Sequence, residues 1–160
     1  MESTDYVGLT QYGGSCTVKG GKLILYAPSD AGIFLAANTK LTLQDTDVET
    51  SSAYKPIGGA GKDKNCKVEV NNSRLRAETV NGSVNPVTGL TSFDLVDCNY
   101  ADNGNYEADY FYFNPQTGTM YYDGQTYTGT LLIEPKAEPV VTGIGEAALL
   151  NDKGEMINDK

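Results

Sequence analysis

The chain has 160 residues, of which 39% are hydrophobic and 18 are glycine, and its formal net charge is −9 with no histidine and no tryptophan. The acidic balance argues against nucleic-acid partners and anionic membrane surfaces, because both are bound through clustered Lys and Arg. The lack of histidine excludes Ser-His-Asp and Cys-His catalysis and histidine metal sites, so we expect no enzymatic activity and no cofactor.

Residues 1–14 predict an N-terminal arm or an edge strand. They hold no basic region followed by an apolar run, so the sequence as written predicts no secretory signal. No stretch of the chain approaches the ~20 apolar residues that are needed to cross a bilayer.

The three cysteines are Cys16, Cys66 and Cys98. An odd number with wide spacing fits neither a disulfide framework nor a zinc site, which usually uses paired cysteines. We therefore expect free, partly buried thiols in a protein made in a reducing compartment.

Short strands are expected at residues 22–27, 32–37 and 41–44, because these apolar runs are separated by Pro, Ser, Asp, Asn and Thr turn residues. Residues 45–64 combine acidic residues, serines and glycines. This stretch predicts a long mobile loop of the kind that is often functional.

Residues 66–70 alternate apolar and polar side chains, which is typical of a half-buried strand. Asn71-Asn72-Ser73 predicts a turn, after which residues 74–80 pair back in a hairpin. The pattern Asn-Pro-x-Thr-Gly occurs at 85–89 and again at 114–118. We interpret it as turn chemistry that arose twice rather than as a copied hairpin.

Residues 106–134 predict a three-stranded antiparallel meander. Asn114-Pro115-Gln116-Thr117-Gly118 marks the first turn, and Asp123-Gly124 marks a second, tight hairpin turn. In the last run, Tyr127, Leu131 and Ile133 alternate with threonines, so one face is expected to be apolar.

Phe111 and Phe113 are expected in the core, because phenylalanine has no polar atom to satisfy. Tyr110 and Tyr112 then face outward, with Tyr121 as a neighbour. This face has two interpretations: ordinary strand-forming tyrosines that tolerate water, or a contact surface for a protein or a sugar.

Residues 97–109 are rich in Asp and Asn around Gly104. Such oxygen-rich loops suit calcium, but the spacing departs from that of an EF-hand loop. We favour a polar turn whose side chains bond their own backbone, and we therefore expect no metal ligands.

The regular spacing of short strands and turns predicts an all-β protein, namely a single antiparallel β-sandwich or flattened barrel of roughly eight to ten strands. Its domain is expected to cover residues 15–134. Pro135 and Pro139 break the pattern, so residues 135–160 predict a C-terminal extension or arm.

A threonine-, asparagine- and tyrosine-rich β domain with unpaired cysteines and no export signal suits a virion component. We expect a non-enzymatic structural protein, such as a capsid cement or decoration protein or a tail or fibre subunit, that forms homo-oligomers. The alternative is an extracellular adhesin or carbohydrate-binding module, with calcium dependence left open; a carboxylate-based hydrolase is a third. The expected interface residues are Tyr110, Tyr112, Tyr121, Pro135, Pro139 and Val140.

Overall fold

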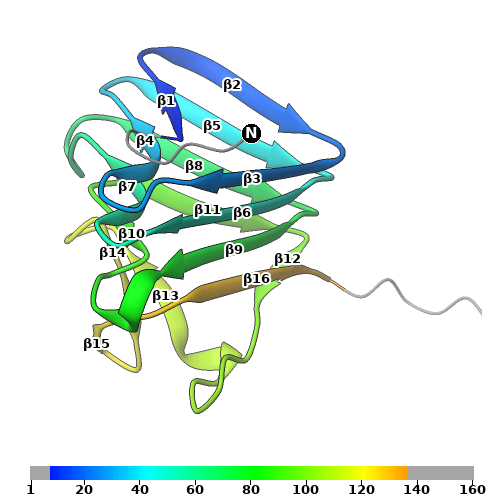
Figure 1. Ribbon diagram of the computed structural model, residues 1–160, viewed down its shortest axis with the longest axis vertical. Helices are drawn as coiled ribbons and strands as arrows, with labels where there is room; N and C mark the ends of the chain where they lie inside the picture. Colours follow the sequence, from blue (N-terminus) through cyan, green and yellow to red (C-terminus); the bar gives the residue numbers. More distant parts are fainter. Residues whose placement is uncertain (1–7, 137–160) are drawn as a thin grey trace, which may run out of the picture.

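The computed structural model describes residues 8–136, which form a parallel β-solenoid of about three turns followed by a small antiparallel sheet (Figure 1). Each turn of the solenoid contributes one strand to each of three sheets. Sheet A has the order β1-β4-β7-β10, sheet B has β11-β8-β5-β2, and sheet C has β12-β16-β9-β6-β3. The fourth, the cap sheet, has the order β13-β14-β15.

The solenoid strands are β1 (Leu9–Gln11), β2 (Gly14–Lys19), β3 (Lys22–Tyr26), β4 (Ala31–Leu35), β5 (Thr39–Gln44), β6 (Asp47–Ser52), β7 (Lys55–Gly59), β8 (Cys66–Asn71), β9 (Arg74–Thr79), β10 (Val87–Thr88), β11 (Ser92–Val96) and β12 (Cys98–Tyr100). The remaining elements are β13 (Phe111–Asn114), β14 (Thr119–Tyr122), β15 (Gln125–Thr126), β16 (Leu131–Pro135) and two short 3₁₀ helices, η1 (Val80–Gly82) and η2 (Ala108–Tyr110).

The corners between sheets B and C are made by residues in the left-handed backbone conformation. Asp45, Asn72 and Asp97 have φ values of 49°, 46° and 53°. Asn and Asp tolerate this conformation better than other side-chain-bearing residues. The side chains also bind one another along the stack: Asn72 Nδ2 donates to Asp45 Oδ1 over 2.8 Å, across 27 residues of sequence. Each corner therefore redirects the chain, and the Asn72 corner also holds the Asp45 corner one turn away.

Columns of apolar side chains fill the interior. In sheet B the parallel register aligns Val18, Leu43, Val70 and Leu95, one from each of the four stacked strands. The two inner members, Leu43 and Val70, are at most 1% exposed, whereas Val18 and Leu95 at the ends of the column are half-buried. Burying a side chain of this size stabilises the fold by about 1.5–3 kcal/mol, so the columns are the main source of stability.

The expected antiparallel sandwich or barrel is wrong. The protein is all-β, but sheets A and B and the β3-β6-β9 part of sheet C consist of parallel strands. The expected hairpin across Asn72 is also wrong: β8 and β9 meet at a corner and belong to different sheets. Alternation of apolar and polar residues reports which face of a strand is buried, and both architectures bury one face in the same way.

The expected mobile loop at 45–64 is likewise wrong, because β6 and β7 occupy most of it. Two polar residues of this stretch make hydrogen bonds to the backbone within the fold. Thr50, only 1% exposed, donates its hydroxyl to the carbonyl of Pro56 over 3.0 Å. The oxygen of Ser52 accepts from the backbone N–H groups of Tyr54 and Lys55. Side-chain bonds of this kind replace backbone pairing at the corner between β6 and β7.

The cap sheet confirms the expected hairpin at Asp123-Gly124, whose φ values of 49° and 85° suit a tight turn between β14 and β15. The third strand of the meander is only partly as expected. It ends at Thr126, and residues 131–135 leave the cap sheet to form β16. β16 is inserted antiparallel between β9 and β12, and Glu134 on it binds Arg74 on β9 over 2.7 Å.

Leu9–Gln11 forms the edge strand of sheet A, within the stretch that was expected to be an arm or an edge strand. The extension from residue 137 onward, with Pro139 and Val140, lies outside the described residues. Within the described part of the chain, no helix is long and apolar enough to span a bilayer.

Candidate functional site

The expected tyrosine surface lies on the cap sheet and is divided between two environments. Tyr112 and Tyr121 are cross-strand partners, and their ring centroids are 5.6 Å apart. The Tyr110 ring instead packs edge-on against Tyr122, at 5.8 Å. Tyr110 and Tyr112 are exposed, Tyr121 is half-buried, and Pro135 is half-buried at the end of β16. The structure therefore pairs Tyr112 with Tyr121 but does not gather the expected residues into one platform.

The opposite face of the cap sheet belongs to the core. Phe111 is buried, as expected, and Phe113 is half-buried and packs 6.2 Å from Phe93. Tyr127 lies edge-on to Phe111 with ring centroids 5.0 Å apart, and its hydroxyl donates to the carbonyl of Thr130 over 2.7 Å. Edge-to-face pairs add about 0.5–1.5 kcal/mol each beyond burial, so this cluster holds the cap on the last turn.

The oxygen-rich loop at 97–109 is a polar turn in the described structure. Asp102 Oδ1 accepts from the backbone N–H of Ala108 over 2.8 Å, and Asn103 exchanges two backbone hydrogen bonds with Tyr106. The Asn103 amide also donates to the carbonyl of Thr130 over 2.7 Å. These side chains are bound to the backbone in the way expected for a turn. Among residues 8–136, no group of three metal-ligating side chains comes together.

The three cysteines are free thiols, as expected: Cys66 and Cys98 are buried, and Cys16 is half-buried on β2. Burial raises the pKa of the Cys98 thiol, although backbone hydrogen bonds from Ser73 and Asn72 partly offset this effect. A buried thiol with a raised pKa is a poor nucleophile, so Cys98 is structural.

Tyr100 provides a test of the packing beneath the cap. Its ring lies 5.9 Å from Phe111, and burial, with a smaller contribution from Asp94, raises its pKa well above the usual value. In the unfolded chain a tyrosine ionises near pH 10. Below that pH both states keep the proton and the full stability is present. Above it the unfolded state alone loses the proton, so stability falls as the pH rises.

We expect Tyr100→Phe to lose less stability than the parent protein between pH 8 and pH 11. The measurement is the free energy of unfolding in urea at both pH values. Tyr112→Phe, on the exposed face of the cap sheet, is the matched control. The assignment is wrong if the two variants lose stability to the same extent. Part of the alkaline loss is expected to remain in both, because burial also raises the pKa of Tyr127.

Among residues 8–136, no strand covers the outer edge of the first turn of the solenoid. Its three strands, β1, β2 and β3, are the edge strands of sheets A, B and C. Four of its inward-facing side chains are only half-buried, whereas their partners one turn later are at most 1% exposed. The half-buried set is Leu9, Cys16, Val18 and Leu23, and the buried partners are Ile33, Leu41, Leu43 and Val48.

The last turn differs, because the cap sheet covers part of it. Met120 on β14 is fully buried, and its backbone N–H and carbonyl both bind the Asn85 side chain, at 3.1 Å and 2.9 Å. The backbone N–H of Leu90 donates to the carbonyl of Gly118. Antiparallel β16 also interrupts the parallel stacking of sheet C. The two ends of the solenoid are therefore chemically distinct.

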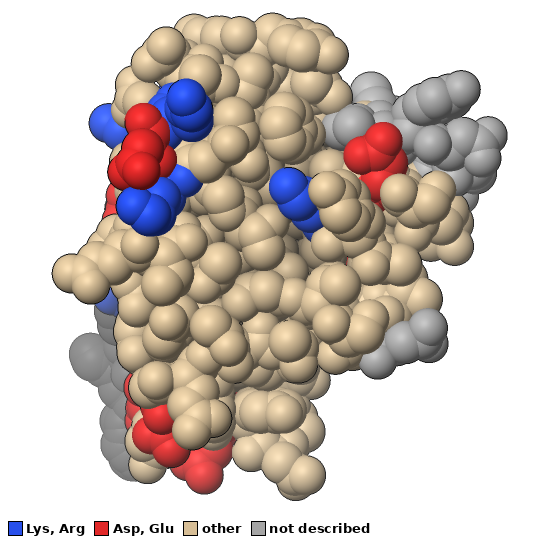
Figure 2. Space-filling view, turned by 90° about the vertical axis from the view of Figure 1, so that its left-hand side faces the viewer, with Lys and Arg blue, Asp and Glu red and all other residues tan. Residues whose placement is uncertain are grey.

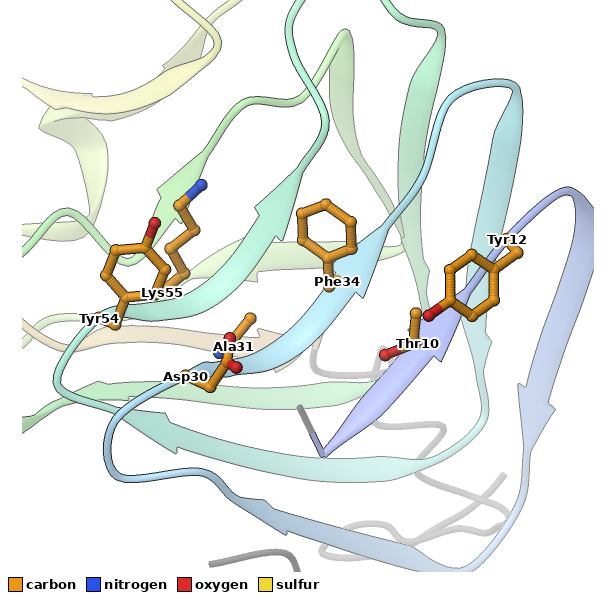
Figure 3. A pocket seen from close by; sticks show the side chains of 7 residues that line it. All are labelled: Thr10, Tyr12, Asp30, Ala31, Phe34, Tyr54 and Lys55. Atoms are coloured by element: carbon orange, nitrogen blue, oxygen red, sulfur yellow. Dashed lines mark hydrogen bonds between the residues drawn. The ribbon is translucent and has the colours of Figure 1, made fainter. Parts of the chain in front are cut away.

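A groove of about 350 Å³ lies on the outer face of sheet A (Figure 3). Its lining residues are Thr10, Tyr12, Asp30, Ala31, Phe34, Tyr54 and Lys55. Figure 3 shows Phe34 on β4 between Tyr12, which follows β1, and Tyr54, which precedes β7. Sequence analysis missed this site, because its residues come from three turns of a solenoid that was not expected.

The polar groups of the groove are held at its Tyr54 side. Lys55 Nζ lies 5.2 Å from the centre of the Tyr54 ring, within the range of a cation–π contact. Asp30 is half-buried; its Oδ1 accepts from the N–H of Ala31 over 2.8 Å, and its backbone carbonyl accepts from the Ser52 hydroxyl. An ammonium and a fixed carboxylate therefore accompany the aromatic rings.

The chain matches no protein-family model, no curated protein and no solved structure.

Proposed function

We propose that the protein is a non-enzymatic structural protein that self-assembles through the open first turn of its solenoid. The observation that carries the proposal is the contrast between half-buried Val18 in the first turn and fully buried Leu43 in the second. Exposed strand edges beside apolar side chains favour pairing with another chain.

The partner we propose is a second copy of this chain. Three strand edges on three sides of the solenoid form the open end, and another solenoid end of the same outline matches all of them at once. The other end also has edge strands, namely β10, β11 and β12, but β16 interrupts its parallel stacking and β14 contacts β10, so this end differs from the first turn. The pairing is therefore end to end between two first turns, an isologous contact related by a two-fold axis.

We propose a virion as the setting, with the protein as a capsid cement or decoration protein or a tail or fibre subunit. A solenoid with one partly capped end and one self-associating end suits a projecting or bridging subunit. The free thiols, Cys16 among them, are compatible with synthesis in the reducing cytoplasm of a host cell. The alternative, an extracellular carbohydrate-binding module, draws support from the groove on sheet A.

The assembly test compares Val18→Lys with Leu95→Lys, because the two residues are half-buried at opposite ends of one column. By light scattering and sedimentation, the parent protein and Leu95→Lys are expected to be dimers. Val18→Lys is expected to weaken the dimer by about 100-fold or more, because an unpaired buried charge costs several kcal/mol. Cys16 is expected to resist a thiol reagent in the dimer and to react in Val18→Lys.

A parent protein that stays monomeric at high concentration, with Cys16 freely labelled, would contradict the assembly proposal. The virion setting is tested separately with gold-labelled antibody on negatively stained particles from the natural source. Labelled particles or filaments support it. A dimer found on no particle would overturn the setting while leaving self-assembly intact.

A further inference from the structure

We propose that the groove on sheet A binds an extended, uncharged saccharide chain. This is a binding activity beyond self-assembly, and it uses a different face of the molecule. The first turn's open end is built from strand edges, whereas the groove lies over the outward side chains of β1, β4 and β7.

The three aromatic rings form an oblique row across sheet A. The register pairs Thr10 with Phe34 and Phe34 with Gly58, so Tyr12 lies two residues beyond the level of Phe34 and Tyr54 lies four residues before it. With a rise of ~3.3 Å per residue and a strand spacing of ~4.8 Å, the row spans roughly 20 Å. A ligand that contacts all three rings must be a chain rather than a single sugar ring.

The ring of Phe34 is accessible because its two neighbours in register are small. Thr10 is a short side chain on β1, and Gly58 on β7 has none. A Cβ at Gly58 would lie 2.8 Å from Cδ of Lys55, so the missing side chain is what lets the Lys55 stem lie along the groove. An apolar ring flanked by a flat floor suits stacking against the apolar face of a pyranose.

The polar groups select for a ligand that both donates and accepts hydrogen bonds. The Asp30 carboxylate accepts, and the Lys55 ammonium donates. A strongly acidic or basic chain would be repelled by one of the two, whereas a polyhydroxyl chain can satisfy both. The described residues give the second carboxylate oxygen of Asp30 no hydrogen-bond partner, which leaves it for a ligand hydroxyl.

The surface around the groove also favours a neutral ligand. Figure 2 shows the side of the molecule on which β4, β7 and β10 lie, and most of its atoms belong to uncharged residues, with Lys, Arg, Asp and Glu in small separate groups. A nucleic acid would require a basic track, which this face does not provide.

The test uses a glycan array followed by titration of the full-length protein with soluble neutral polysaccharides, namely dextran, laminarin and galactomannan. Tyr12→Ala and Tyr54→Ala are the groove variants, because these rings are 83% and 54% exposed and their loss leaves the core intact. Tyr112→Ala is the matched control, an exposed tyrosine on the cap sheet. Binding is measured for the parent protein and the three variants, with and without EDTA, after thermal unfolding has shown that all four are folded under the conditions of the assay.

We expect at least one neutral chain to bind, with each groove variant about tenfold weaker or more, since each variant removes one of the three stacking rings; tenfold corresponds to about 1.4 kcal/mol. Tyr112→Ala and EDTA are expected to leave binding unchanged. A blank array, binding confined to acidic glycans, or loss of binding in Tyr112→Ala but not in Tyr12→Ala would each overturn the proposal. None of these outcomes depends on whether Val18 supports a dimer.

Discussion

Leu43→Ala is expected to lower the free energy of unfolding by about 2–5 kcal/mol, the range found when a fully buried leucine is truncated. Leu43 is 1% exposed and lies between Val18 and Val70 in its column. Columns continue above and below it, so the surrounding turns cannot collapse into the space without breaking their backbone pairing. For a chain of this size, each kcal/mol lowers the melting temperature by about 2–4 °C.

The control is Val18→Ala, at the half-buried end of the same column. It removes fewer apolar atoms from a site that water already reaches, so we expect less than half the loss seen with Leu43→Ala. Urea unfolding followed by circular dichroism gives both values, and dilute protein avoids any contribution from dimers. Equal losses would mean that the first turn is not the open end of the solenoid.

Gly59→Ala is expected to destabilise the fold by about 1–3 kcal/mol or more through overpacking. A Cβ at this position would lie 2.5 Å from the carbonyl oxygen of Gly89 and 3.0 Å from Cβ of Cys66. The Gly89 oxygen is a backbone atom and the Cys66 Cβ is bonded directly to the backbone, so neither can move aside by a simple side-chain rotation. The backbone at Gly59 and the backbone at Gly89 can approach this closely only because both residues are glycine.

Gly58→Ala is the matched control, because the neighbouring glycine points outward. There the added Cβ meets only the flexible side chain of Lys55, at 2.8 Å from its Cδ atom. We expect a change within about 1 kcal/mol, since replacing glycine by alanine also reduces the entropy of the unfolded chain. Thermal unfolding of the two variants side by side is sufficient. If Gly58→Ala proves as costly as Gly59→Ala, the inward and outward faces of β7 are assigned incorrectly.

The groove shows why the site could not be found from the sequence. Tyr12, Phe34 and Tyr54 are separated by long stretches of chain, and their alignment depends on the parallel register of β1, β4 and β7. A repeated pattern was present: Asn38 and Asn65, both at positive φ, precede corresponding strands and bind through their side chains across 27 residues. Fixed spacing of such corner residues, with apolar alternation after each, is the signal of a solenoid.

The cap shows the opposite case, in which local chemistry was sufficient. Asp123-Gly124 selects a tight turn by its backbone preferences alone, and the pairing of Tyr121 with Thr126 follows from that turn. The inward position of Phe111 follows from its lack of polar atoms. Beyond Gly129, however, the chain leaves the cap, because Leu131 and Ile133 are buried against β9 rather than against β14.

By itself, the sequence determined that the chain is all-β, where most of its strands lie and which side of them is apolar. The tertiary structure decided the partner of each strand and the direction of pairing. The physical reason is that the side-chain pattern of a strand reports only which of its faces is buried. The strands that pair with β5 are instead set by backbone hydrogen bonds to β2 and β8, one turn away on either side. Because these bonds join backbone atoms, the local pattern of side chains does not predict which strands they connect.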